Sequence, residues 1–356
     1  MTAERRRQLI ARAALALWAA GTACLIWLML VYPNRHQVTP YKDFVVELPA
    51  GATAEVLAKR MAEDKVVSDA WALTIYFRLM GVESNLRRGY VVLNRALSVR
   101  ELLPRLARNF GTSKVRVLLP EGFTRFDAAT RLERFGVASR AALLSAGSDP
   151  ALLQRLGVQA DSVEGYLFPA VYDFSQESDA NAVLTRMVRV FRERTQALFD
   201  AYAMAHDGAP FSLTPHQLLT LASIVEREAR VPDERPVIAG VFMNRLVDET
   251  FKPKRLQADP TVAYGCLVAR DKVPTCAEYD GRRITPAMLR DPENPYSTYR
   301  RDGLPPGPIC SPGLDSLKAA LTPAAHDYFY FVTKGGGRHA FSHSLEDHNQ
   351  RIKESP

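Results

Sequence analysis

An uncharged apolar run near the N-terminus limits what this 356-residue chain can fold into. Residues 13–32 read AALALWAAGTACLIWLMLVY. As a helix, a run of this length spans about 30 Å, the thickness of the hydrocarbon core of a bilayer. Four arginines lie among residues 1–12, and basic residues are sparser directly after the run. The positive-inside rule therefore predicts one transmembrane helix at 13–32, a cytoplasmic tail at 1–12, and an exported body after Tyr32.

A cleaved signal peptide is the competing interpretation of this run. The run is longer than a normal signal core and has no clear small-x-small cleavage site at its end. The segment from Gly21 to Cys24 faintly resembles a lipoprotein processing site, but apolar residues continue from Leu25 to Tyr32. We therefore expect an uncleaved membrane anchor.

The basic balance of the chain raises the question of a nucleic-acid partner. The formal net charge is +7, but lysines and arginines are dispersed, and no RNP, zinc-finger or P-loop pattern appears. We expect no nucleic-acid binding. The length allows two or three domains with buried cores of their own, so folding requires neither a metal nor a disulfide.

Three cysteines lie in the part predicted to be exported, where disulfides persist. Cys266 and Cys276 flank a polar loop and are ten residues apart, so a bridge between them is possible, with Cys310 left over. A zinc site is the weaker alternative because the chain has no CxxC pair.

An internal repeat organises the N-terminal part of the exported body. LPAGAT at 48–53 matches LPEGFT at 119–124, an offset of 71 residues. Each copy predicts a strand (44–48 and 115–119), a Pro-x-Gly turn, a helix capped by threonine, and a second helix capped by Ser68 or Ser139. Between the copies we expect a strand at 89–93 and a helix at 98–109. The first repeat unit occupies 43–112, and the second occupies 113–160.

The strongest sign of chemistry is a helix at 214–230, TPHQLLTLASIVEREAR, which follows a long amphipathic helix at about 180–205. Thr214 and Gln217 form the pattern of a capping box at its start. Glu226 projects from the apolar arc, and poor solvation raises a carboxyl pKa, as a general acid requires. An ion pair between this carboxyl and an arginine is the structural alternative, and the helix alone does not decide between them.

Further along the chain lie segments typical of a carbohydrate groove. VEGYLFPAVYDF at 163–174 offers aromatic faces for sugar rings, with Glu164 and Tyr166 as contacts, although a core-lining turn is also possible. A helix is predicted at 233–248 and a closing strand at 328–332. Between these two elements lie long loops rich in Pro, Gly, Asn and Tyr, which are more often functional than structural.

The ordered set of motifs resembles the endolytic murein transglycosylases, the YceG-like family of bacterial cell-wall enzymes. The resemblance rests on the membrane helix and on a series of segments: GYVVL at Gly89, PEG at Pro120, EGYLFP at Glu164, LASIVE at Leu221, LQADPTVAYG at Leu256, NPYSTYRRDGLPPGPI at Asn294, SPGLDSLKAA at Ser311, YFYFV at Tyr328 and GRHAFSHSLEDHN at Gly337. Ala170 and Val171 depart from the family's usual Asp-Thr, which puts a substrate contact by that turn in doubt.

This resemblance implies an α+β fold with a LysM-like α/β subdomain at 43–112 and a larger mixed helical catalytic domain at 161–356 with long groove-forming loops. It implies cleavage of the β-1,4 bond between N-acetylmuramic acid and N-acetylglucosamine in nascent glycan strands, without water, leaving 1,6-anhydromuramyl ends and terminating strand elongation. Such a reaction needs one carboxyl and no cofactor, and the resemblance assigns that carboxyl to Glu226. Glu228, about 200° round the helix, is expected to be structural, for example paired with a nearby arginine.

The resemblance also suggests the surroundings of the reaction. The partners are peptidoglycan glycan strands, the bacterial inner membrane and cell-wall synthases, with the catalytic domain periplasmic or extracytoplasmic. Amides, hydroxyls and aromatic faces of the loops are expected to bind the sugars. The predicted binding residues of the loops are Gln257, Asp259, Thr261, Tyr264, Asn294, Tyr296, Thr298 and Tyr299.

Two alternatives complete the analysis. His339, His343 and His348 could suggest a zinc hydrolase, but their spacing falls on a predicted strand end, so we expect packing or hydrogen bonding and no metal site. The second alternative is a non-catalytic peptidoglycan-binding scaffold of the same fold.

Overall fold

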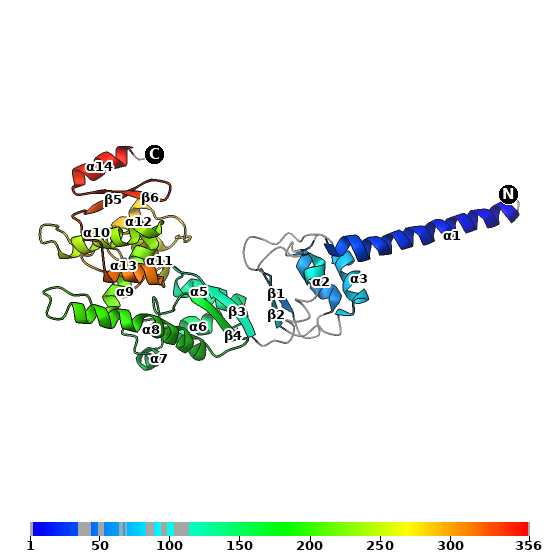
Figure 1. Ribbon diagram of the computed structural model, residues 1–356, viewed down its shortest axis with the longest axis horizontal. Coiled ribbons are helices and arrows are strands. Elements are labelled where there is room, and N and C mark those ends of the chain that lie inside the picture. Colours follow the sequence, from blue (N-terminus) through cyan, green and yellow to red (C-terminus); the bar gives the residue numbers. More distant parts are fainter. Residues whose placement is uncertain are drawn as a thin grey trace. The chain divides into compact units, whose positions relative to one another are not determined.

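The computed structural model describes residues 3–34, 44–48, 53–63, 67, 70–82, 89–93, 98–102 and 114–354. The chain divides into two compact units (Figure 1). The first comprises residues 1–115 and 134–137, and the second comprises residues 116–133 and 138–356. The architecture is α+β: in the described part of the chain, helices surround three separate two-stranded sheets.

The first unit begins with the helix that the apolar run predicts. Helix α1 (Ala3–Ile26) continues into a π-helical turn (Trp27–Val31) and a 3₁₀ turn (Tyr32–Asn34). The stretch Glu4–Asn34 is long and apolar enough to cross a membrane. Strand β1 (Phe44–Leu48), helices α2 (Ala54–Glu63) and α3 (Ala70–Leu79), and strand β2 (Gly89–Leu93) follow. The two strands pair antiparallel, with Phe44 opposite Leu93, which confirms both predicted strands at their predicted bounds.

The helix expected at 98–109 is seen only at its start. Helical residues begin at Val99, and Ser98 forms a capping box with Glu101: the Glu101 carboxylate accepts from the Ser98 backbone N–H at 2.9 Å. Residues 103–109 of this predicted helix and the predicted cap Ser68 lie outside the described residues.

The second unit contains the remaining elements. They are β3 (Lys114–Leu119), α5 (Arg125–Arg134), α6 (Arg140–Ala146), α7 (Pro150–Arg155), β4 (Ala170–Ser175), α8 (Ala180–Ala205), α9 (Pro215–Glu228), the 3₁₀ turn η4 (Pro232–Glu234), α10 (Arg235–Val247), α11 (Asp259–Val268), the 3₁₀ turn η5 (Pro274–Cys276), α12 (Pro286–Arg290), α13 (Leu314–Leu321), β5 (Tyr330–Gly335), β6 (Arg338–Ser342) and α14 (Leu345–Glu354).

The second repeat has the predicted order of a strand and two helices. Ser139 caps α6 as expected, since its side chain accepts from the Ala142 N–H. Strand β3 pairs with β4, which ends at Ser175. The partner of the first strand of this repeat therefore lies after residue 160, where we expected the second repeat unit to end.

Helix α9 lies at the centre of the core of the second unit. The predicted capping box is confirmed: Thr214 accepts from the Gln217 N–H, and the Gln217 side chain accepts from the Thr214 N–H. Its residues from Leu218 to Val225 are all buried, and α10, α11 and α13 pack around it.

The closing strand is shifted relative to its prediction. β5 begins at Tyr330 rather than Tyr328, because the carbonyls of Tyr328 and Phe329 accept hydrogen bonds from Asn244 and Arg245 of α10. A glycine turn then leads into β6, where Phe341 lies opposite Phe331. The result is a hairpin that packs beside α14.

Candidate active site

Helix α9 carries two carboxyl groups near its C-terminal end, on different sides. Glu226 and Glu228 are two residues apart, which separates their side chains by about 200°. Their surroundings in the second unit differ accordingly.

The Glu226 carboxylate is held by groups of the protein itself. Its Oε2 accepts hydrogen bonds from the Gly313 N–H at 3.1 Å and the Ser316 hydroxyl at 2.6 Å, at the start of α13. A guanidinium nitrogen of Arg235 lies 3.7 Å from Oε1, and the Glu226 side chain is only 9% exposed. A negative charge at a helix N-terminus stabilises that helix, so these contacts join the end of α9 to the start of α13.

Three sequence motifs meet around Glu226. The backbone of the PEG turn pairs with the SPG loop, because Gly122 N–H donates to Ser311 O at 2.9 Å and Ser311 N–H donates to Phe123 O at 2.8 Å. Glu121 lies against Gly313, where an added Cβ would come within 2.1 Å of its Oε1. Burial and the neighbouring charge of Glu226 raise the pKa of Glu121.

Glu228 lines a pocket of about 490 Å³ on its own side of α9. The lining comes from α9, α10, the start of α11, the Tyr299 loop, the β5–β6 hairpin and α14. The lining residues are Glu228, Arg245, Gln257, Asp259, Tyr299, Tyr330, Phe331, Val332, Thr333, His339, Leu345, His348, Asn349 and Ile352. Glu226 is not among them.

The pocket changes the acidity of Glu228. Burial, and secondly the negative charge of Asp259, raise its pKa to about 7, against the opposing positive charges of Arg245 and Arg227. Among the described residues, no hydrogen-bond donor contacts its carboxylate and no basic nitrogen lies within 4.0 Å of it. The expectation that Glu228 pairs with an arginine is therefore wrong, since its side chain faces the pocket.

Arg245 forms part of the pocket wall from α10. It is buried, its Nε donates to Phe329 O at 2.6 Å, and it also donates to Leu256 O. Burial lowers its pKa to about 10. Its guanidinium lies 5.4 Å from the ring centre of Tyr330, so the charge is fixed beside the pocket.

Three of the predicted binding residues lie together in this pocket: Gln257, Asp259 and Tyr299. The Tyr299 hydroxyl donates to Asp259 at 2.6 Å. Gln257 has φ of +51°, an unusual backbone conformation for a residue other than glycine, and its N–H donates to Thr298 O at 3.1 Å. Strained backbone of this kind concentrates at functional sites.

Five other predicted binding residues are buried and hydrogen-bonded to protein groups. They are Glu164, Thr261, Tyr264, Asn294 and Thr298, each 3% exposed or less. Glu164 accepts from the Arg125 N–H and the Tyr264 hydroxyl, and burial raises its pKa to about 7. Thr298 and Asn294 lie in the loop between α12 and α13 and hold it to α11. Thr298 accepts from the Ala258 N–H at 3.0 Å, and Asn294 donates to Val262 O at 3.0 Å. These residues support the walls instead of lining them.

Tyr166 and Tyr296 are half-buried and do not line the pocket of Glu228. The Tyr166 hydroxyl lies 2.8 Å from His216 Nδ1. The ring of Tyr296 packs edge-on against Tyr264, with centroids 4.8 Å apart.

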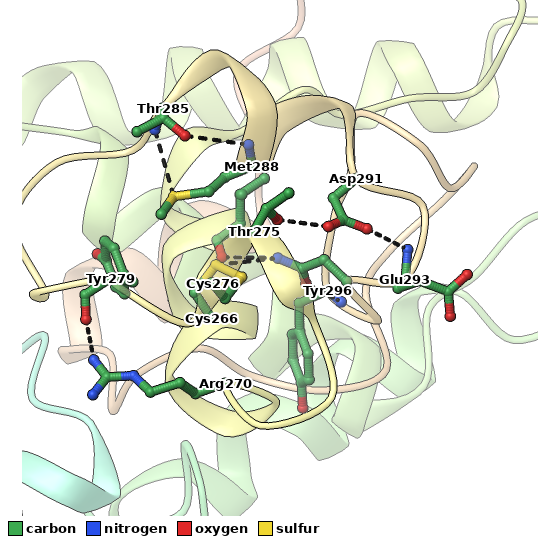
Figure 2. The surroundings of a disulfide bond; sticks show 12 residues. Cys266, Arg270, Thr275, Cys276, Tyr279, Thr285, Met288, Asp291, Glu293 and Tyr296 are labelled. Atoms are coloured by element: carbon green, nitrogen blue, oxygen red, sulfur yellow. Dashed lines mark hydrogen bonds between the residues drawn. A yellow bond between two sulfur atoms is a disulfide. The ribbon is translucent and has the colours of Figure 1, made fainter.

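Cys266 and Cys276 form a disulfide in the structure, joining α11 to the turn η5 (Figure 2). The bridge lies in a small apolar core that includes Tyr279 and Met288. Cys310 is a buried free thiol elsewhere in the second unit. The bridge therefore stabilises the loop that follows α11.

The three C-terminal histidines have separate partners, although His339 and His348 both line the pocket of Glu228. The Nδ1 of His339 lies 2.7 Å from Glu234, and that of His343 lies 2.9 Å from Asp327. His348 stacks on Tyr330 at the pocket wall. Within the described residues, no group of three or more His, Cys, Asp or Glu side chains has the arrangement of a metal site.

A carboxyl with a pKa near neutrality in a polar pocket is the kind of site that acid–base enzymes use. The chain matches the YceG-like family over residues 46–354 and therefore belongs to that family. A protein of Bacillus subtilis named endolytic murein transglycosylase is 28% identical, over 86% of this chain and 82% of its own length. A protein of the same name from Streptococcus pneumoniae is 25% identical, and the match covers 88% of this chain and 58% of that protein.

A solved structure supports the same fold. The crystal structure of a YceG-like protein from Listeria monocytogenes is 27% identical, with a TM-score of 0.60, and the match covers 87% of this chain and 99% of that one.

Proposed function

We propose that this YceG-like protein is a membrane-anchored endolytic murein transglycosylase and that Glu228 is its general acid and base. The names of the two relatives support the activity. The observation that carries the residue assignment is the position of Glu228 in the pocket, with a pKa of about 7 and no protein partner for its carboxylate among the described residues.

The reaction requires one residue to move two protons. Protonated Glu228 donates to the oxygen that links N-acetylmuramic acid to N-acetylglucosamine, and the bond from the muramyl C1 to that oxygen breaks. The C6 hydroxyl of the same muramyl residue then attacks C1 and gives its proton to the Glu228 carboxylate. A 1,6-anhydro ring forms, no water is consumed, and Glu228 regains its starting state.

The geometry of α9 favours Glu228 over Glu226 for both proton transfers. Glu226 accepts hydrogen bonds from Gly313 and Ser316 and lies beside Arg235, so groups of the protein already occupy its carboxylate oxygens. An acid must be protonated at the start of the reaction, and it must be able to reach the substrate. Glu228 meets both conditions in the apo pocket.

The other lining residues suit a sugar chain. Gln257, Asp259 and Asn349 present polar groups to hydroxyls and acetamides, while Tyr299 and Tyr330 offer ring faces. The apolar side chains Leu345 and Ile352 of α14 complete one wall.

The proposed setting is the outer side of a bacterial cytoplasmic membrane. Helix α1 is the anchor, with its arginine-rich end in the cytoplasm and the chain after Tyr32 outside. A disulfide between Cys266 and Cys276 supports this orientation, because disulfides persist outside the cytoplasm. The β1–α2–α3–β2 unit would be the LysM-like subdomain, and nascent glycan strands and their synthases would be the partners.

Two isosteric variants of the full-length protein test the assignment. Glu228→Gln is expected to lower the rate of strand cleavage by about 10²- to 10⁴-fold, because it cannot donate the proton. Glu226→Gln is the matched control on the same helix. It is expected to keep most activity while losing about 1–2 kcal/mol of stability, because its contacts to α13 weaken.

Mass analysis of the products from isolated glycan strands identifies the reaction. Anhydromuramyl ends support the proposal, and reducing ends would indicate a hydrolase. If no cleavage occurs, the protein is a non-catalytic peptidoglycan-binding scaffold. An inactive, folded Glu226→Gln beside an active Glu228→Gln would transfer the catalytic role to Glu226.

A further inference from the structure

The end of the anchor helix is built into the core of the first unit. Leu28 and Tyr32 are buried in the same apolar cluster as Leu73, Tyr76 and Phe77 of α3. The rings of Tyr32 and Tyr76 meet edge to face, with centroids 6.3 Å apart. The last turns of the anchor helix therefore pack directly against α3.

This packing fixes the height of α3 relative to a bilayer. If the span begins after Arg12, about 20 residues reach its outer boundary near Tyr32. Leu28 lies about 6 Å below Tyr32 along the helix axis. Because α3 packs against this last turn, α3 lies at the level where the hydrocarbon core meets the headgroups.

The side of α3 that faces away from the core is mostly apolar. Its exposed residues Trp71 (58%), Ile75 (39%) and Leu79 (54%) follow each other at a spacing of four, and Met80 (52%) adjoins them. The one charged residue of α3, Arg78, is also exposed, and it forms an ion pair with Glu55 of α2 at 3.3 Å. Tryptophan is enriched where membrane proteins meet the headgroup layer.

The neighbouring helix α2 provides a comparison within the same unit. It packs against α3 and has the same length, but charged side chains dominate its exposed side, including Glu55, Lys59 and Arg60. One helix therefore has the surface of a water-facing helix and the other does not. An exposed apolar patch of this kind marks a contact surface.

We propose that the α3 face, formed by Trp71, Ile75, Leu79 and Met80, lies in the outer interfacial layer of the membrane that α1 spans. The inference rests on the proposed anchor. The transmembrane helix and this face together hold the first unit against the bilayer at a fixed height and orientation. The occupant of the α3 face is lipid.

Single-tryptophan proteins test this placement, since the chain has three tryptophans. Full-length Trp18→Phe/Trp27→Phe retains only Trp71 and is reconstituted in phosphatidylcholine vesicles whose acyl chains are brominated at a shallow or a deep position. Trp71 is expected to show blue-shifted emission and stronger quenching by the shallow bromines. A protein that retains only Trp18, the sixth residue of the span and about 8 Å inside its inner boundary, is expected to respond more strongly to the deep bromines than Trp71 does.

A tryptophan at Val56 of α2, with the three natural tryptophans replaced by Phe, is the control for orientation and is expected to remain unquenched. Unquenched Trp71 beside quenched Trp18 would overturn the inference and leave the anchor intact, since the α3 face would then contact water or protein. Unquenched Trp18 would overturn both the membrane anchor and the placement of the α3 face. Equal quenching at Val56→Trp and Trp71 would exclude an oriented α3 face.

Discussion

At the scale of single residues, the charge of Asp259 affects the pKa of Glu228. Its negative charge is the second contribution, after burial, to the raised pKa of Glu228. It accepts a hydrogen bond from the Tyr299 hydroxyl, which holds its side chain at the pocket. Asp259 therefore helps to keep the acid protonated near neutral pH.

Asp259→Asn should narrow the pH range of activity. Removing this charge lowers the pKa of Glu228, so the acid loses its proton at a lower pH, and the alkaline limb of kcat/KM moves to lower pH. The measurement is the pH profile of strand cleavage. Asp302→Asn, an exposed aspartate beside Arg255, is the control and should leave that limb in place. A limb that does not move in Asp259→Asn would contradict the electrostatic role.

Glu164 should make stability depend on pH. Its folded pKa is about 7 against an ordinary value of 4.5, so the folded state holds a proton that the unfolded state releases. Its contribution to the free energy of unfolding is therefore complete below pH 4.5 and lost as the pH rises towards 7.

Glu164→Gln removes this titration. Its melting temperature should fall less between acidic and neutral pH than that of the parent protein, as calorimetry would measure. An unchanged pH dependence would mean that Glu164 is ionised in the folded state.

The choice between Glu226 and Glu228 shows where sequence reasoning stops at this scale. The helical spacing places the two carboxyls on different sides of α9 and predicts a poorly solvated Glu226. The Glu226 side chain is 9% exposed, and its contacts are with Arg235 and with Ser316 of α13. Only the arrangement of α14 and the β5–β6 hairpin creates the pocket beside Glu228, and no local pattern encodes that arrangement.

At the scale of elements, capping and strand patterns predicted much of the fold. β1, β2 and α8 have their predicted bounds, and Thr214 begins α9 as expected, because these features depend on neighbouring residues. The start of β5 was wrong by two residues because α10 takes two carbonyls from it. The buried polar residues among the predicted binding residues could not be distinguished from the residues that line the pocket, because both groups have polar side chains.

Thr214→Ala tests how much the cap of α9 contributes. Loss of the capping box should lower the free energy of unfolding by about 1 kcal/mol, measured by denaturant titration. Thr130→Ala is the control, because Thr130 lies inside α5 and caps no helix: its exposed hydroxyl donates to Phe126 O and accepts from Arg140 Nε. Its effect should stay within about 0.5 kcal/mol. Equal losses in both variants would deny the cap a special role.

At the scale of the whole molecule, the state of the cysteines reports on the compartment. The chain has four cysteines, of which Cys24 and Cys310 are free in the structure. If the second unit is exported, denatured protein should show two reactive thiols before reduction and four after it.

The measurement is mass spectrometry after alkylation of protein prepared from the native membrane. Four thiols before reduction would place the second unit in a reducing compartment and reverse the proposed topology. Cys24→Ser should lower both counts by one, which confirms that the label reaches the membrane helix.

The pairing of the PEG turn with the SPG loop has a consequence for the order of events during export. The PEG turn lies early in the second unit, and the SPG loop to which it is hydrogen-bonded lies almost 200 residues later in the sequence. Helix α14, later still, completes the wall of the pocket. In the proposed topology the N-terminus stays in the cytoplasm, and the residues after the anchor cross the membrane in order towards α14. The proposed site would therefore be incomplete on a partly exported chain and would form only once α14 has crossed.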